Sequence, residues 1–310
     1  MSKLYRALSA LVAVFLILLV LTLIFKLIKG TWFGKGLGHG EEVAVIDVSG
    51  MMVGATSTLR ELDDIQENKA IKAVVVHINS PGGLVAPSQE IYEAFRRLDK
   101  KMPVIISMAS LAASGGYYAA LGGRKIFANP GTLTASIGVI MELANTEKLY
   151  HWAKVDKYDI KAGKFKDIGT PLRAMTDEER VLLSNMLTDI HRQFRATVKE
   201  RRKLTDAELD AVADGRVMTG AQAKAAKLVD ELGGLQDALH EAKAQAKLPE
   251  DAHVEYISDE HEGLLKKLVL GSLADNISAL QKSIEALSQA TGQADSTSPG
   301  WRIMLLAPVR

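Results

Sequence analysis

Ser114 lies in the stretch MASLAASGGYY (residues 108–118), between two alanines and two glycines. It follows an apolar segment and precedes Gly115, so the sequence predicts Ser114 at a junction between a strand and a helix. The first amides of a helix have no partner inside the helix, and the helix dipole is positive there, which suits an oxyanion. Serine is also a common N-cap residue, so these residues alone fit either a nucleophile or a cap.

A second glycine-bearing turn follows the preceding strand-like segment. The stretch HINSPGGLV (77–85) contains Asn79-Ser80-Pro81-Gly82-Gly83. Ligands of open parallel sheets bind beyond the carboxyl ends of the strands, and glycines allow close approach of a backbone. Gly82 or Gly83 could therefore give a second amide donor to the oxyanion, although a plain tight turn fits the same residues.

A nucleophilic hydroxyl needs a base, and the seven histidines show no triad context. The sequence AASGG also differs from the G-x-S-x-G nucleophile elbow. Lysine can act as the base when its amine is neutral, which requires burial or a nearby positive dipole. The stretch DIKAGKFKDIGTP (159–171) offers Lys161, Lys164 and Lys166, and the spacing does not rank them.

The elements that must position these groups alternate between strand and helix from residue 43 onward. Apolar, β-branched runs predict strands at 43–48, 72–78, 103–107, 125–128, 137–141 and 155–160. Helices are expected at 58–68, 87–100, 205–212, 220–227 and 235–246. Near-continuous apolar strands separated by helices predict an α/β fold, a mostly parallel sheet with covering helices.

A long helix is expected to begin after Thr176. Thr176 and Glu179 have the spacing of a capping box. The helix has an apolar stripe made of Leu182, Leu183, Met186, Leu187, Ile190, Phe194 and Val198. This periodicity predicts one face packed against other residues.

The two ends of the chain differ from its middle. Arg6 and Lys26 bracket residues 7–25, an uncharged apolar run long enough to cross a hydrocarbon core of about 30 Å. No small-x-small cleavage site follows, so the sequence predicts one retained N-terminal transmembrane helix. The expected organisation is an anchor region at 1–29, a flexible linker at 30–42, a catalytic domain at 43–246 and a C-terminal extension at 247–310.

The C-terminal extension carries an apolar stripe of its own. Leu273, Ile277, Leu280, Ile284 and Leu287 are spaced as on one face of a helix, which fits either assembly or packing on the same chain. The chain has 310 residues, a formal net charge of +1 and no cysteine. These values give no support to a nucleic-acid partner and exclude disulfides and cysteine nucleophiles.

Several motifs, in order, resemble one family over roughly residues 40–245. They include NSPGG (79–83), ASGGYY (113–118), TASIG (134–138), GKFKDI (163–168) and GRVMTGAQAKAAKLVDELGG (215–234). The chain resembles the single-domain bacterial signal peptide peptidases of family S49, which are membrane-anchored Ser-Lys peptidases with a ClpP/crotonase-like core.

The resemblance implies roles for five residues. Ser114 would be the nucleophile, Lys166 the general base and Ser136 the residue that orients the lysine amine. Gly83 and Gly115 would supply the oxyanion amides. No cofactor or metal is implied.

The resemblance also implies a setting. The substrates would be remnant signal peptides and other hydrophobic peptides, and the catalytic domain would lie on the extracytoplasmic side of the bacterial inner membrane. Homo-oligomeric assembly is expected, with the lysine allowed to come from a neighbouring subunit. Two alternatives stay open: a related Ser-Lys protease that cleaves one specific membrane protein, and a crotonase-like acyl-CoA enzyme.

Overall fold

The computed structural model describes residues 40–257 of the chain. The predicted transmembrane segment at 7–25 and the predicted helical stripe at 273–287 lie outside these residues. Between residues 40 and 257, no helix combines the length and the apolar character needed to cross a membrane.

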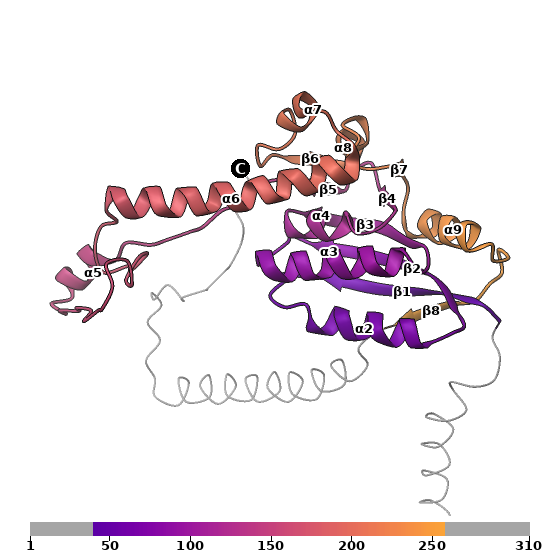
Figure 1. Cartoon of the computed structure of the whole chain (residues 1–310), viewed down its shortest axis with the longest axis horizontal. Coiled ribbons are helices and arrows are strands. Elements are labelled where there is room, and N and C mark those ends of the chain that lie inside the picture. Colours follow the sequence, from indigo (N-terminus) through magenta and orange to yellow (C-terminus); the bar gives the residue numbers. More distant parts are fainter. Residues whose placement is uncertain (1–39, 258–310) are drawn as a thin grey trace, which may run out of the picture. The chain divides into compact units, whose positions relative to one another are not determined.

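A single, mostly parallel sheet organises residues 40–257 (Figure 1). Its eight strands in this range are β1 (Glu42–Ser49), β2 (Ile71–Ser80), β3 (Val104–Ala113), β4 (Lys125–Ala128), β5 (Leu133–Ala135), β6 (Val217–Thr219), β7 (Glu231–Leu232) and β8 (Val254–Ile257). The main path runs β6-β5-β3-β2-β1-β8, and β4 pairs with β3 and β7. Only the β5–β6 pair of the described strands is antiparallel. The prediction of an α/β fold with a mostly parallel sheet is confirmed.

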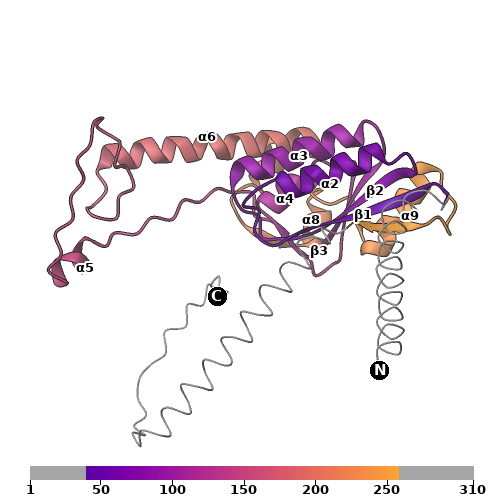
Figure 2. The ribbon, with the colours of Figure 1, turned by 90° about the horizontal axis from the view of Figure 1, so that it is seen from below.

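Helices connect and cover these strands. In the described part of the chain they are α2 (Thr56–Glu67), α3 (Val85–Asp99), α4 (Gly115–Ala120), α5 (Glu147–Trp152), α6 (Asp177–Arg202), α7 (Asp206–Asp210), α8 (Gly220–Ala225) and α9 (Leu235–Ala246). Helices α2, α3 and α4 lie on one face of the sheet, and α9 lies on the other (Figures 1 and 2).

The two faces of the sheet follow from the alternation of side chains along each strand. In β1, Ala44 and Ile46 belong to the larger core beneath α2, α3 and α4. Val43 and Val45 point the other way, into a smaller core with Leu239 of α9. Because both faces are covered, the central strands are apolar at nearly every position.

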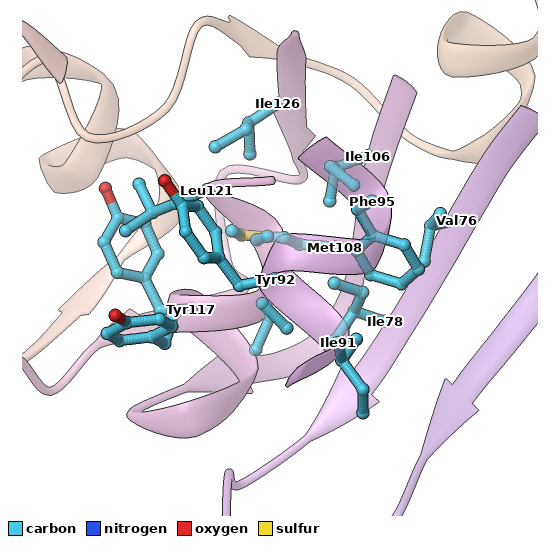
Figure 3. Packing of buried hydrophobic residues seen from close by; sticks show 14 of the residues in the cluster. Val76, Ile78, Ile91, Tyr92, Phe95, Ile106, Met108, Tyr117, Leu121 and Ile126 are labelled. Atoms are coloured by element: carbon cyan, nitrogen blue, oxygen red, sulfur yellow. The ribbon is translucent and has the colours of Figure 1, made fainter. Parts of the chain in front are cut away.

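The larger core fixes the position of α4 against the sheet (Figure 3). Phe95 of α3, Met108 of β3 and Tyr117 of α4 are all fully buried within it. The Tyr117 hydroxyl donates to the carbonyl oxygen of Leu228 at 2.9 Å, and burial raises its pKa. The start of α4, where Ser114 lies, is thus fixed by packing on several sides.

Helix α6 begins with the capping box predicted from the sequence. The Thr176 side chain accepts a hydrogen bond from the Glu179 amide, and the Glu179 carboxylate accepts one from the Thr176 amide. Only the C-terminal half of the apolar stripe is buried, at Phe194 and Val198. The N-terminal half continues away from the sheet (Figure 2).

Residues 138–176, here called the arm, connect β5 to α6 and contain no buried residue. The strands predicted at 137–141 and 155–160 are wrong, because both segments lack strand pairing. Ile137 is buried in the larger core, but other apolar residues of these segments are exposed: Ile140 is 80% exposed and Ile160 is 95% exposed. Apolar runs in the arm therefore do not indicate strands of the sheet.

Five elements of the described range lie where the sequence analysis predicts none: α5, β5, β6, β7 and β8. Helix α5 forms within the arm, and β8 pairs in parallel with β1. Strand β8 begins at Val254, which is beyond residue 246, where the sequence places the end of the catalytic domain. The sheet therefore includes residues assigned above to the C-terminal extension.

Candidate active site

Ser114 lies at the junction between β3 and α4, as predicted. Its backbone has φ 52° and ψ −119°, a conformation that L-residues rarely adopt. The side chain makes no capping hydrogen bond to the helix. The cap interpretation therefore fails, whereas strain of this kind is typical of functional positions.

Two backbone amides lie beside the serine. A Cβ built on Gly82 would lie 2.5 Å from the Gly115 nitrogen, and one built on Gly115 would lie 3.2 Å from the Gly83 nitrogen. The 79–83 turn and the start of α4 are thus in direct backbone contact. No acceptor within residues 40–257 takes a hydrogen bond from the amide of Gly83 or Gly115. Two unpaired donors beside a hydroxyl form an arrangement that can hold a tetrahedral oxyanion.

Glycine is required at positions 82 and 83 of the turn because a side chain there would collide with backbone atoms. Gly82 has φ +94° and no room for a Cβ. A Cβ on Gly83 would lie 2.3 Å from the carbonyl oxygen of Met52. The Ser80 hydroxyl accepts a hydrogen bond from the Gly82 amide at 3.1 Å, which fixes the turn from within. The turn is therefore more constrained than a plain strand-to-helix connection needs to be.

Ser136 lies next to Ser114 through strand pairing. Ala113 pairs with Ala135, and the Ser114 amide donates to the Ala135 carbonyl at 2.8 Å. Both Ala135 and Ser136 have positive φ, at 63° and 52°. The Ser136 hydroxyl donates to the Gly215 carbonyl at 3.5 Å. The structure brings these two serines together, although neither sequence segment shows it alone.

The three candidate lysines differ in their partners. Lys161 pairs with Asp167, and Lys164 pairs with Glu178. The Lys166 ammonium has neither a hydrogen bond nor an ion pair to any residue between 40 and 257. A base must have a free amine, so this difference favours Lys166 among the three.

Lys166 is not brought to Ser114 within one chain. Gly169 and Arg173, just after Lys166, line a pocket of about 440 Å³ together with Glu179 at the start of α6. Ser114 lies beside Ile190, which is further along the same helix. Eleven residues of α-helix between Glu179 and Ile190 span about 16 Å. Figure 2 shows the same separation between the segment following α5 and helix α4.

Comparison with known proteins identifies the family. Residues 96–249 match the sequence profile of Peptidase family S49, and residues 51–134 match that of Clp protease. A protein of Synechocystis sp. named "Putative protease" is 38% identical over 245 residues, which cover 76% of this chain and 88% of that protein. The chain belongs to peptidase family S49. The mixed α/β fold with its parallel-rich sheet fits a ClpP-like core, in agreement with the resemblance noted from the sequence.

Two further relatives of this S49 chain are matched over less of their own length. A "Putative protease" of Methanocaldococcus jannaschii is 36% identical, over 66% of this chain and 65% of its own length. A "Putative signal peptide peptidase SppA" of Enterococcus faecium is 35% identical, over 65% of this chain and 59% of its own length. The chain thus matches less than two thirds of each of these two proteins.

A small pocket beside Ser114 was not found from the sequence. Its volume is about 40 Å³, and Gly83 and Gly115 line it together with Ser114. Apolar and polar side chains from four segments complete it: Val85, Ser88, Gln89, Tyr118, Val139, Ile190 and Phe194. The α6 stripe already contained Ile190 and Phe194, but periodicity could not show that they face the serine. In the described range no group of three or more His, Asp or Glu residues could hold a metal ion.

Proposed function

We propose that this chain is a membrane-anchored serine endopeptidase with a Ser114–Lys166 dyad, acting on remnant signal peptides and other hydrophobic peptides. The observation that carries the proposal is the strained, uncapped Ser114 beside the unpaired amides of Gly83 and Gly115. The apolar side chains around the serine support a hydrophobic substrate residue at this position. Anchoring by residues 7–25 and an extracytoplasmic catalytic domain are part of the proposal.

The mechanism follows from the groups present. A neutral Lys166 amine takes the Ser114 proton, and the alkoxide attacks a peptide carbonyl carbon. The amides of Gly83 and Gly115 stabilise the negative oxygen of the tetrahedral intermediate. The lysine then gives its proton to the leaving amine, and water hydrolyses the acyl-enzyme. Ser136, next to Ser114, accepts or donates a hydrogen bond that orients the amine.

The base is proposed to come from a second copy of the chain. Within one chain the arm segment that carries Lys166 lies near the start of α6, and Ser114 lies near its middle. The arm also exposes large apolar side chains, with Trp152 and Tyr158 each 81% exposed. Apolar side chains that find no cover in their own chain suit an interface between copies. A homo-oligomer in which one arm reaches the neighbour's serine uses both features.

Complementation between inactive variants tests this arrangement. Ser114→Ala and Lys166→Ala should each abolish cleavage of a hydrophobic reporter peptide while the thermal transition stays in place. Co-expressed with different tags and purified as mixed oligomers, the two variants should regain activity, because roughly a quarter of sites in an equal random mixture contain both groups. Full activity in either single variant refutes the dyad. Absence of activity in the mixture refutes only the sharing between subunits.

Substrate class needs a separate measurement. Membrane peptides that accumulate in cells producing the Ser114→Ala variant should be remnant signal peptides of many sequences. Accumulation of one uncleaved membrane protein instead would favour the alternative of a specific partner. A serine-directed phosphonate should label Ser114, whereas a crotonase-like acyl-CoA enzyme would not react.

A further inference from the structure

A chain of ion pairs fixes the turn that carries Lys166 to the start of α6. Arg173 donates to Asp167 Oδ2 from both Nε, at 3.2 Å, and Nη2, at 2.9 Å. The same guanidinium donates to both carboxylate oxygens of Glu179, at 2.8 and 2.5 Å. Lys161 donates to the other oxygen of Asp167. These four residues, Lys161, Asp167, Arg173 and Glu179, are called the arm cluster below.

The two carboxylates of the arm cluster are largely shielded from solvent. Glu179 is 3% exposed and also closes the capping box of α6 with Thr176. The Asp167 side chain is 11% exposed. Bonds of Asp167 to Lys161 and Arg173 lower its pKa, and Arg173 together with the Thr176 amide lowers the pKa of Glu179 to about 2. Both carboxylates are therefore ionised at neutral pH.

Backbone bonds extend the same support to the turn itself. The Lys166 amide donates to the Gly163 carbonyl at 3.2 Å, and the Thr170 amide donates to the Asp167 carbonyl at 2.9 Å. The Thr146 amide donates to the Pro171 carbonyl at 2.7 Å, which connects the start of α5 to this segment. The backbone at 166 is thus held, while the lysine side chain projects without a partner in the described part of the chain.

The charges of the arm cluster sum to zero. Two cations, Lys161 and Arg173, balance two carboxylates, Asp167 and Glu179. Asp167 directly follows Lys166 in the chain, yet both of its oxygens are taken by the cluster's cations. It is therefore not available as a counter-ion that would hold the lysine in its protonated form. Elsewhere in the arm and at the start of α6, the charged side chains are Glu142, Glu147, Lys148, Lys154, Asp156, Lys157, Asp159, Lys164, Asp177, Glu178 and Arg180, and His151 is also titratable. Lys164 and Glu178 pair with each other.

We propose that Asp167, Arg173 and Glu179 are positioning residues for the base of the peptidase: they hold the turn that carries Lys166 against the start of α6, and together with Lys161 they form a cluster of zero net charge next to it. The inference rests on the proposed function, since it gives these residues a role only if Lys166 is the base. Neither the family match nor the capping box assigns it to them.

Two variants of Arg173 distinguish an effect on the position of the Lys166 amine from an effect on the charge around it. Arg173→Lys keeps the positive charge but loses the two-pronged contact. We expect kcat to fall about tenfold or more, because the lysine amine is displaced, while the acid limb (the low-pH side of the pH profile of kcat/KM) stays in place. Arg173→Gln leaves one excess negative charge, which favours the protonated lysine. Its acid limb therefore moves to higher pH by about half a unit, the order expected of one unit charge acting on the amine through solvent and salt.

Asp167→Asn gives the opposite change of charge. One excess positive charge disfavours the protonated lysine, so the acid limb moves to lower pH by about the same half unit. A merely structural role would lower kcat in all three variants without opposite movements of the pH profile. Arg192→Gln is the matched control, because Arg192 forms a surface ion pair with Asp189 outside the arm cluster. Its rate and profile should match those of the wild type.

The outcomes distinguish the two proposals. The measurements use the full-length oligomer with a hydrophobic reporter peptide, and each variant is checked by its thermal transition. Suppose that Lys166→Ala abolishes activity. If Arg173→Gln and Asp167→Asn then leave both kcat and the acid limb unchanged, or move the acid limb in the same direction, the positioning role is refuted and the dyad stands. If Lys166→Ala retains full activity, the proposed function itself fails.

Discussion

Replacing Gly82 with alanine tests the oxyanion site without touching the serine or the lysine. The new methyl group would lie 2.5 Å from the Gly115 nitrogen and 2.9 Å from the Ala113 carbonyl oxygen. Both neighbours are backbone atoms, so the contact cannot be relieved by rotation of a side chain. The turn and the start of α4 must separate, and the amides of Gly83 and Gly115 then no longer converge on one point.

The magnitude has a catalytic part and a stability part. Loss of one oxyanion donor lowers kcat by about 10²- to 10³-fold. Alanine at a left-handed φ costs about 1–2 kcal/mol, and overpacking adds about 1–3 kcal/mol. For a domain of this size the combined loss lowers Tm by about 5–15 °C. KM should change less than kcat, because the donors act mainly on the transition state.

The assay compares Gly82→Ala with Gly50→Ala. Gly50 also has a positive φ, of 76°, but a Cβ there would meet nothing within 4 Å. Gly50→Ala should therefore lower Tm modestly, by the backbone strain alone, and keep kcat/KM within about threefold of the wild type. Reporter cleavage and calorimetry are measured on both full-length variants. If Gly82→Ala retains wild-type kcat, the convergence of the two amides is not what stabilises the oxyanion.

Two further predictions follow from the pocket and from the arm cluster. Ile190→Ala enlarges the pocket beside Ser114. The ratio of kcat/KM for a reporter with leucine before the cleaved bond to kcat/KM for one with alanine there should therefore rise about tenfold. An unchanged ratio would exclude this pocket as the specificity site. Glu179 has its pKa lowered from 4.5 to about 2 by Arg173, so its contribution to stability is present above pH 4.5 and is lost as pH falls toward 2. Glu179→Gln should therefore show a flatter dependence of Tm on pH in this window than the wild type, and parallel curves would contradict the assignment.

The central sheet could be predicted because its strands are long and buried on both faces. The segments 43–48, 72–78 and 103–107 correspond to β1, β2 and β3, since near-continuous apolar runs of this length are typical of strands in a covered parallel sheet. The short strands β5 to β8 have two to four residues each, too few for any periodicity to show. Their pairing depends on distant segments, which a local pattern does not contain.

The errors at 137–141 and 155–160 have a common cause. An apolar run predicts that its side chains are buried, but the sequence does not identify the residues that would cover them. Within these runs Ile137 is buried, but most of the apolar side chains in the arm have little cover from the rest of the described chain, as the exposure of Ile140 and Ile160 shows. The N-terminal half of the α6 stripe behaves in the same way. Under the proposed homo-oligomer, these apolar runs would make contacts with a second copy that a single chain does not make.

The candidate site was partly accessible from the sequence. The motifs located Ser114, Gly83 and Gly115, and the structure places the two amides beside the serine. The pairing of Ala113 with Ala135 and the contacts of Arg173 were not accessible, because each joins segments through geometry rather than spacing. The dyad with Lys166 stays a prediction.

The positive φ at Ser114 lowers the stability of the fold at the same residue that supplies the candidate nucleophile. Glycine accepts φ near 52° freely, whereas serine there is strained by about 1–3 kcal/mol, and no capping bond offsets it. Ser114→Gly should therefore raise Tm, because glycine relieves the strain, and on the proposed function it should also abolish cleavage, because it removes the nucleophile. If Ser114 is the proposed nucleophile, its backbone strain is therefore the stability cost of placing a hydroxyl at this position.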